Sequence, residues 1–445
     1  MPSSSDRHVE QSDPAAAHPP PRTSLGDLAR LVGRLARAAV THPQSFSLRQ
    51  ELWTWIRKTA RRRQSENLVL DLLVTKILLV GGRELSKHIL ADPPHEACYV
   101  EGDLKRRSMS ALAPQALTIS HGEKWQRLRH FNTQVLDVVE DPVYRAAFLR
   151  HVRRAFAAPV RSVEDVRTAM GRANRAIVFG DGIAPDHISE DVRTLFSYVQ
   201  NPVKRILLGW RAAQRRERLY EDLGQLWQQT TESDEPSLIA AAHRYADGLT
   251  TEETIQQIPH WMFTFTGSGT DFLVRALALV ASRPEVRTRA RDEIAAAGPL
   301  DDPEATEHLP FLEACLREAA HLFPPVPQTF HCAPHGDTFN GLRVPPEMEV
   351  MHVFPLPEPG TDSKPEYRVF RPERWLGDSA PSPAFSPFLG GARSCPGESL
   401  ILVVCKLALA LLLGQQKREV SSPTLATDPL PLTFPEDEVR ITSPS

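Results

Sequence analysis

Apolar positions recur with helical spacing along most of the 445-residue chain. The last helical stretch is an almost continuous apolar run, which is typical of a buried helix. Between these stretches, residues 98–120 show no clear periodicity. Helices are therefore predicted for residues 24–63, 122–136, 140–180, 187–232, 255–282 and 400–413.

A few shorter stretches have the character of strands. Residues 66–90 contain two apolar β-like runs and, after Gly81-Gly82, a short helix. Residues 341–354 have the pattern of short strands, and residues 429–441 that of a terminal hairpin whose tip borders a pocket. We expect small sheets beside a larger helical part.

The helical stretch 255–282 carries an internal weakness. Gly267 and Gly269 lie in its middle, and each glycine inside a helix costs about 1 kcal/mol relative to alanine. We therefore expect a kink at these two glycines.

The decapeptide FLGGARSCPG, residues 388–397, directly precedes the apolar helix. Arg393 offers a fork of donors to a carboxylate. Cys395 stands where a backbone cradle, a metal and the helix dipole favour a thiolate. The alternative is an ordinary surface turn with a free cysteine. Positive φ angles, which let a backbone lie flat against a planar ligand, are open to the glycines at positions 390, 391 and 397.

This decapeptide resembles the cysteine loop of the cytochrome P450 family, F-x-x-G-x-R-x-C-x-G. A chance match somewhere in the chain has a probability on the order of one in ten thousand. The resemblance covers residues 25–445 and implies a single-domain, mainly α fold with small β-sheets. Haem would lie between a long central helix and the cysteine loop. Residues 1–24 have the composition of a disordered, Pro-rich N-terminal tail.

The resemblance also assigns residues to the cofactor, heme b (iron protoporphyrin IX). Cys395 is the expected metal ligand. Trp125 and Arg129 match W-x-x-x-R, which holds a haem propionate in the family, although an ordinary amphipathic helix is the alternative. His331 stands about where many members carry a propionate-binding arginine. The expected cofactor-binding set is Cys395, Arg393, Trp125, Arg129, His331, Phe388, Gly391 and Gly397.

The central helix departs from the family pattern of an acid followed by an alcohol, which relays protons. The family spacing places Gly267 at the acid and Ser268 at the alcohol. A slip of two residues places Gly269 and Thr270 there, with Asp271 next. We expect Ser268, Thr270 and Asp271 to be the catalytic candidates. The carboxylate part of the relay requires Asp271 to turn inward or water to substitute.

A second departure concerns the family's E-x-x-R helix. Glu318 takes the glutamate position, His321 takes the arginine position, and FRPERW supplies Arg374 as the third member. A histidine brings fewer donors and is largely neutral at pH 7, so an unsupported Glu318 would cost about 3–5 kcal/mol. We expect either a protonated His321 or a stronger contact between Glu318 and Arg374. Alternatively, Glu313 and Arg317 pair by themselves.

Charge and cysteine content exclude several classes of protein. A net charge of −3 argues against nucleic acid as the main partner. No signal-peptide pattern and no uninterrupted membrane-length apolar run is present, so we expect a cytoplasmic protein that does not contact membranes. The spacing of the five cysteines fits neither a disulfide framework nor a zinc site. These cysteines are Cys98, Cys315, Cys332, Cys395 and Cys405.

A strongly basic segment, residues 201–220, resembles the helix that roofs the substrate pocket in this family. Its charges are expected to face solvent. Positions that either contact a substrate or pack in the core are Phe196, Val199, Ile206 and Leu207.

The function implied by the resemblance is that of a haem-thiolate monooxygenase. It would insert one oxygen atom from O2 into a small organic substrate in secondary metabolism. Electrons would come from a ferredoxin or flavodoxin and its reductase, since the chain contains no reductase domain, and we expect a monomer. One alternative is a peroxide-driven reaction, dehydration, rearrangement or coupling. Another is a degenerate family member that binds a partner without turnover.

Overall fold

The computed structural model describes most of the chain from residue 19 to residue 442. The described residues are 19–41, 55–56, 58–59, 62–63, 65, 67–71, 76–81, 83–91, 99–182, 184–231, 235–302, 304–353, 368–377, 388–414, 419–431 and 433–442. Cys98 and residues 1–18 of the predicted tail therefore lie outside the described part.

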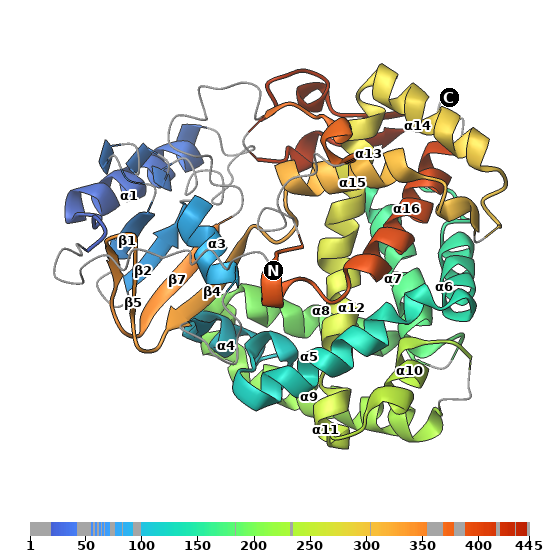
Figure 1. The fold of residues 1–445 in the computed structure, drawn as a ribbon, viewed down its shortest axis with the longest axis horizontal. Helices are drawn as coiled ribbons and strands as arrows, with labels where there is room; N and C mark the ends of the chain where they lie inside the picture. Colours follow the sequence, from blue (N-terminus) through green and yellow to red (C-terminus); the bar gives the residue numbers. More distant parts are fainter. Residues whose placement is uncertain are drawn as a thin grey trace, which may run out of the picture.

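Helices make up most of the described structure, as predicted (Figure 1). In chain order they include α1 (Leu25–Thr41), α3 (Arg83–Ala91), α4 (Asp103–Met109), α5 (Gly122–Leu136), α6 (Pro142–Ala155), α7 (Val163–Phe179), α8 (Asp186–Gln200) and α9 (Pro202–Gln229). They continue with α10 (Leu238–Tyr245), α11 (Thr251–Ile255), α12 (Ile258–Thr264), α13 (Thr270–Ala281), α14 (Pro284–Ala297), α15 (Pro310–Leu322) and α16 (Glu398–Gly414).

A five-stranded sheet lies to one side of the helices (Figure 1). Its order is β1-β2-β7-β4-β3, and only the β2–β7 pair is parallel. The predicted strands of residues 66–90 and the helix after them are present. The strands are β1 (Asn67–Asp71), β2 (Lys76–Val80), β3 (Val100–Glu101), β4 (Gln328–Ala333) and β7 (Met348–Val353).

Two smaller sheets complete the β-structure, one joining β5 (Asp337–Phe339) to β6 (Leu342–Val344). The other joins β8 (Glu419–Ser421) to β9 (Arg440–Thr442). The hairpin predicted within residues 429–441 is therefore wrong, because β9 pairs with a strand that precedes this stretch.

The described end of the predicted N-terminal tail packs on the large sheet. The backbone of Thr23 donates to the Val69 carbonyl at 2.9 Å, and Val69 donates to the Pro21 carbonyl at 2.9 Å. Thr23 is buried. The boundary predicted at residue 24 is thus a few residues late.

Both long helices predicted for residues 140–180 and 187–232 are divided in two. Ser162 caps α7 by accepting a hydrogen bond from the Asp165 amide, and α7 ends before Gly180, whose φ is 83°. Asn201 caps α9 in the same way, with Pro202 at its first position. The breaks were not predicted, because the sequence has helical periodicity on both sides of each capping residue.

The central helical stretch is interrupted as predicted. Between α12 and α13, Phe265–Gly269 winds as a π-helix, so the irregularity falls on Gly267 and Gly269. Every residue of α13 except Asp271 is buried, and α13 packs against α15 and α16 in the main core. Figure 1 shows α12 and α13 running through the middle of the helical part.

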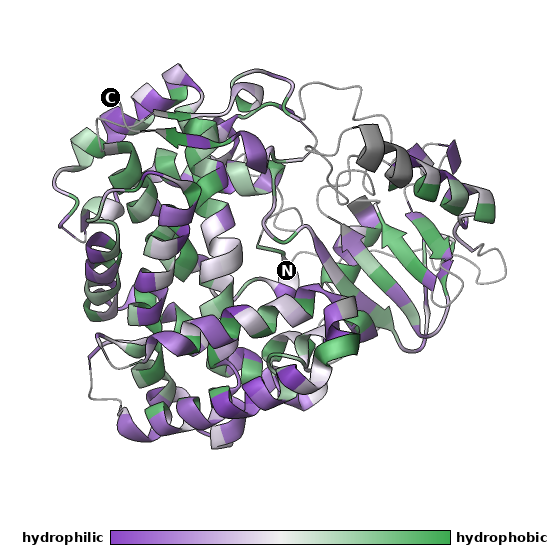
Figure 2. Ribbon diagram, turned by 180° about the vertical axis from the view of Figure 1, so that it is seen from behind, coloured by the Kyte–Doolittle hydropathy of each residue, from purple (hydrophilic) through white to green (hydrophobic). Residues whose placement is uncertain are grey.

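Hydropathy separates the inner and outer helices (Figure 2). The strands of the large sheet are mostly hydrophobic, whereas α9, at the lower edge, carries much hydrophilic surface. Among the described helices, none is both long and apolar enough to cross a membrane.

Candidate functional site

The cysteine loop is a tight turn that leads into α16. The Cys395 amide donates to the Phe388 carbonyl at 2.7 Å, and the Ser394 amide donates to the Gly391 carbonyl at 3.2 Å. Positive φ angles occur at Gly391 (63°) and, unexpectedly, at Leu389 (62°). Such an angle is uncommon for a side chain of that size.

The expectation of positive φ at all three loop glycines is only partly correct. Gly390 is extended, with a φ of −139°. Gly397 does not have a positive φ either, and its carbonyl accepts from the Ile401 amide at 3.0 Å in the first turn of α16.

The Cys395 side chain is reachable by solvent, although protein surrounds it closely enough to perturb its ionisation. Burial raises the pKa of its thiol and Glu398 adds to this, whereas a hydrogen bond from the Gly397 amide and the charge of Arg129 lower it. The loop alone therefore keeps the sulfur protonated. A bound metal would favour the thiolate, which is the form that acts as a ligand.

Helix α5 lies beside the cysteine loop and brings Arg129 to it. The Arg129 guanidinium donates to the Ser394 carbonyl and, at 3.1 Å, to the Ser394 hydroxyl. Trp125 is buried one turn earlier, where it packs with Leu117 and Leu128. Of the two residues of the W-x-x-x-R pattern, Arg129 is thus the one that contacts the loop.

Arg393 meets a carboxylate, but that carboxylate belongs to the protein. Its guanidinium donates to Glu101 at 2.9 Å and to the Tyr99 carbonyl, and both side chains are buried. Glu101 also binds Lys105 at 2.6 Å. Sequence reasoning missed Glu101, because residues 98–120 carry no periodic signal and its partner lies 292 positions away.

His331 lies in β4 directly opposite Glu101 in the β3–β4 ladder. The sheet therefore brings His331 close to Arg393, as its expected role requires. Its Nδ1 is buried and finds no hydrogen-bond partner among the described residues. Burial, together with the charge of Arg393, holds the pKa of His331 well below its usual value. His331 is thus a neutral imidazole with an unused polar atom.

The central helix meets the cysteine loop through aromatic rings. Phe272 of α13 packs edge-on against Phe388, with ring centroids 5.7 Å apart. Gly269 in the π segment lies so close to α16 that a Cβ there would be 2.9 Å from the Ile401 methyl group. The cysteine loop therefore packs on α13, and the π segment packs on α16.

The three predicted catalytic residues are adjacent on this helix, but their side chains have local partners. The Ser268 hydroxyl donates to the Thr264 carbonyl at 2.9 Å. The buried Thr270 hydroxyl donates to the Phe265 carbonyl at 3.4 Å. Asp271 lies 3.6 Å from the guanidinium of Arg275, so its carboxylate is engaged in an ion pair.

Glu318 in α15 is fully buried and well supported. It accepts hydrogen bonds from the Arg371 amide at 2.9 Å and the Trp375 indole at 2.8 Å, and the Arg374 guanidinium lies 2.9 Å away. The Glu318–Arg374 contact is thus one of the two expected arrangements. His321 packs edge-on against the Trp375 ring.

The alternative pair in the same helix is present as well. Arg317 donates to Glu313 at 3.0 Å and to Glu398 at 2.6 Å, while Lys406 binds the other oxygen of Glu313 at 3.0 Å. These pairs link α15 to the start and middle of α16.

The expected substrate-contacting positions separate into two groups. Phe196 and Val199 are partly buried, and the Phe196 ring stacks on Phe263 at 4.4 Å. Ile206 and Leu207 are 81% and 69% exposed, so the prediction that they face inward is wrong. Helix α9 is distorted at Leu208, next to these two residues.

His260 was not identified from the sequence, although it packs edge-on against Phe263 at 4.7 Å. Burial lowers its pKa to about 4, and its Nδ1 has no hydrogen-bond partner among the described residues. A histidine one turn before Thr264 could have been noticed, but no spacing rule in the sequence connects it to Phe196.

Comparisons with known proteins agree with this fold. The family model described as "Cytochrome P450" matches residues 213–436, half of the chain. The solved structure of cyanobacterial CYP120A1 with bound retinoic acid superposes with a TM-score of 0.70 at 19% identity. It covers 86% of this chain and 93% of that one, which establishes the fold.

Curated relatives are similar over shorter stretches. Cytochrome P450 4A10 of Rattus norvegicus is 30% identical over 204 residues, 44% of this chain and 39% of the relative. Cytochrome P450 monooxygenase dtxS2 of Metarhizium robertsii is 31% identical over 150 residues, 30% of this chain and 29% of the relative. The chain thus spans only about a third of the length of these relatives. The family match and the fold together show that the chain belongs to the cytochrome P450 family.

Proposed function

We propose that the protein is a haem-thiolate monooxygenase that inserts one oxygen atom from O2 into a small organic substrate, in secondary metabolism. The observation that carries the proposal is the solvent-reachable Cys395 sulfur in the turn before α16. The same turn packs through Phe388 on Phe272 of the central helix, which opens into a π segment. The Metarhizium relative is named as a monooxygenase, which supports the same activity.

Family membership implies a haem cofactor, and the residues present fit it. Cys395 is the expected iron ligand, and its raised thiol pKa is the state that metal binding would reverse. The buried Nδ1 of His331 offers a polar atom with no protein partner among the described residues. When bound, haem with a thiolate ligand supplies the chemistry of dioxygen activation.

Two arginines and a neutral histidine near the loop would hold the haem carboxylates in this proposal. Arg129 contacts Ser394, the residue before Cys395, and would turn from Ser394 to a propionate. Arg393 is held in place by its ion pair with Glu101. His331 lies opposite Glu101 in the β3–β4 ladder. Trp125 would fix the helix that carries Arg129, and Phe388, Gly391 and Gly397 would shape the loop.

Ser268 in the π segment and Thr270 at the start of α13 would move protons, and their hydroxyls now donate to backbone carbonyls. A hydroxyl can rotate from such a carbonyl to a water molecule or a substrate. Asp271 would take part only after leaving Arg275. We propose that electrons come from a ferredoxin or flavodoxin with its reductase, and that the enzyme acts as a cytoplasmic monomer.

The test is the absorption spectrum of the purified protein after reduction and binding of carbon monoxide. We expect a thiolate-type Soret band in the wild type and its loss in Cys395→Ala. A matched control is Cys405→Ala, since Cys405 is buried within α16 and should leave the band in place. A haem-free wild-type protein would overturn the proposal.

A second candidate function keeps the haem but uses peroxide directly, or catalyses a dehydration, rearrangement or coupling. The ion pair between Asp271 and Arg275 favours it, because the nearest carboxylate after the two candidate alcohols is occupied. Turnover with peroxide, compared with turnover supported by NADPH and redox partners, separates the two functions. Turnover with peroxide alone would favour the second.

A further inference from the structure

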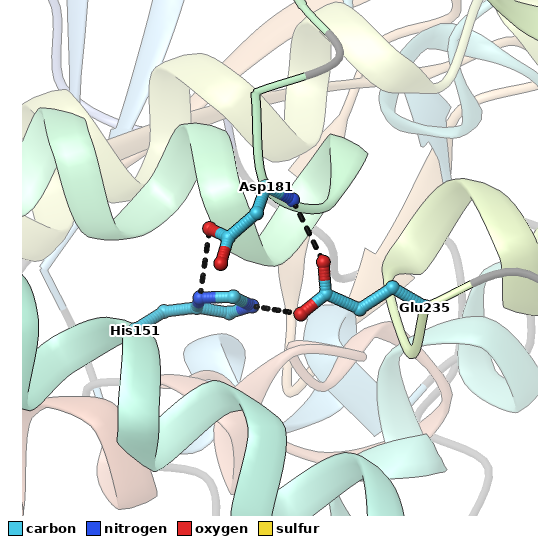
Figure 3. Close-up of side chains that lie close together, drawn as sticks. All are labelled: His151, Asp181 and Glu235. Carbon is cyan, nitrogen blue, oxygen red and sulfur yellow. Dashed lines mark hydrogen bonds and ion pairs between the residues drawn. The ribbon is translucent and has the colours of Figure 1, made fainter.

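Three side chains that could bind a metal ion meet at the surface, on segments to which no role in the haem site is assigned. His151 belongs to α6, Asp181 follows α7, and Glu235 precedes α10. One potential ligand atom from each lies within 4.8 Å of the other two. Figure 3 shows the imidazole edge of His151 placed between the two carboxylates.

The imidazole of His151 is buried and points at both acids. Its Nδ1 lies 3.4 Å from an Asp181 oxygen, and its Nε2 lies 3.9 Å from a Glu235 oxygen. Only 1% of the residue is exposed, and its Nε2 has no hydrogen-bond partner among the described residues. Burial lowers the pKa of His151, which keeps the ring neutral at pH 7 and able to act as a ligand.

The two carboxylates are already positioned relative to each other. The backbone amide of Asp181 donates to Glu235 at 3.0 Å, which fixes one oxygen of Glu235. Their side chains are 35% and 30% exposed, so an ion can enter from solvent. An imidazole nitrogen with two carboxylate oxygens is a ligand set suited to zinc and similar divalent ions.

Two arginines now neutralise these carboxylates. Arg154 pairs with Asp181, and Arg150 binds Glu235 at 2.6 Å. Both guanidinium side chains are more than half exposed, and exposed ion pairs contribute little to stability. The arginines can therefore swing into water when a doubly charged cation arrives, but they compete with it.

We propose that His151, Asp181 and Glu235 form a binding site for a divalent transition-metal ion such as Zn²⁺. Tetrahedral zinc with bonds of about 2.0–2.1 Å holds its ligand atoms about 3.3 Å apart. The Nδ1–Asp181 separation of 3.4 Å already meets this requirement. Glu235, which now faces Nε2, must move toward Nδ1, and the Arg154 guanidinium, 3.4 Å from Nδ1, must leave. Water completes the coordination. The bound ion would join three separate segments at the end of α6.

The test is isothermal titration of the haem-loaded protein with Zn²⁺ alone, after removal of bound metals with a chelator. We expect one saturable site in the wild type. His151→Gln should weaken binding at least about tenfold. The double variant Arg150→Gln/Arg154→Gln should tighten binding about tenfold, because it removes both competing cations. His187→Gln is the control, since His187 faces a single carboxylate, that of Asp222, at 2.9 Å.

The proposal would be overturned if the wild type showed no saturable binding, or if wild type and His151→Gln bound Zn²⁺ with equal affinity. Unchanged or weaker Zn²⁺ binding by the double arginine variant would also overturn it. The soluble yield and the carbon monoxide spectrum of each variant show whether it is folded. If His151→Gln fails to fold, Glu235→Gln replaces it, because the Glu235 side chain is partly exposed whereas that of His151 is buried.

Discussion

The carboxylate of Glu318 shows how a buried charge is supported when a histidine replaces an expected arginine. Three groups, from Arg371, Arg374 and Trp375, donate to it or pair with it. Even so, burial raises its pKa to about 7, which outweighs the opposing effect of Arg374. Near neutral pH, these three groups therefore do not fully offset the cost of burying the Glu318 charge.

Replacing Arg374 with alanine should reduce the free energy of unfolding by about 3–5 kcal/mol, because Glu318 would remain buried without its charged partner. Urea unfolding measures the change. Arg289→Ala is the control: its ion pair with Glu373 is exposed, so its loss should cost less than about 1 kcal/mol. Equal effects of the two variants would contradict the assigned role of Arg374.

Replacing Glu318 with glutamine should flatten the pH dependence of stability. The folded-state pKa of about 7 lies above the ordinary value of 4.5, so between these values the native state holds a proton that the unfolded state has released. Stability from this group is full below pH 4.5 and is lost as pH rises through 7.

Urea unfolding of wild type and Glu318→Gln, at several pH values across that window, measures this effect. The wild type should lose up to about 3 kcal/mol more than the variant between the two ends of the window. Parallel curves would mean that Glu318 titrates at its ordinary pKa.

At the scale of elements, the π segment Phe265–Gly269 fits the central helix against both α7 and α16. The missing side chain at Gly269 allows Ile401 to approach, with Met170 of α7 close by. Gly267, on a different face, has nothing within 4 Å of its missing Cβ. The two glycines therefore have different structural roles despite their equal effect on helix propensity.

Gly269→Ala and Gly267→Ala form a matched pair that tests this difference. A methyl group at 269 would lie 2.9 Å from Ile401 and 3.2 Å from the Thr264 carbonyl, so it should cost about 1–3 kcal/mol. At 267 the same change should be neutral or stabilise the helix by up to about 1 kcal/mol. Thermal unfolding of both variants compares them, and a larger loss at 267 would refute the assignment.

A helix or strand feature could be predicted from the sequence when residues close to it in the chain determine it. The irregularity at Gly267 and Gly269 was predictable, because glycine weakens a helix wherever it lies. The helix breaks at Ser162 and Asn201 were missed, since a capping side chain resembles any other polar residue until its backbone partner is known. The pairing of β9 with β8 depends on tertiary contacts that a local pattern does not contain.

At the scale of the whole molecule, one buried carboxylate, that of Asp27, ties α1 to Arg63. Asp27 binds Arg30 and Arg63 at 2.7 Å each and accepts from the Ser24 amide at 2.9 Å. Burial alone would raise its pKa, but these hydrogen bonds hold it well below the usual value. The Asp27 carbonyl also accepts from the Trp55 indole at 2.9 Å.

Asp27→Asn should loosen this attachment without disturbing the haem site. We expect trypsin to cleave near Arg30 about tenfold faster, with an unchanged carbon monoxide spectrum. Since the pKa of Asp27 is depressed, the wild type should show the same loosening only as pH falls below its ordinary value of 3.8. Asp103→Asn, which breaks only exposed ion pairs, should leave cleavage unchanged.

The family of the protein could be predicted from a few residues, whereas the side-chain contacts around the site could not. Cys395, Arg393 and Gly391 identify the family because their spacing is local and specific. The orientation of Ile206 was wrongly expected, because helical periodicity does not say which side of α9 meets the core. Likewise, nothing in residues 98–120 indicated that Glu101 would meet Arg393.

The Arg393–Glu101–Lys105 chain also predicts how this protein can diverge. Arg393 and Glu101 balance each other in a buried setting, so a change at either position leaves an uncompensated charge, whereas Lys105 is partly exposed and its loss leaves that pair intact. Among relatives that share this arrangement, positions 101 and 393 should therefore change together or remain fixed together. Their co-variation in an alignment would reveal a contact that the spacing of the residues conceals.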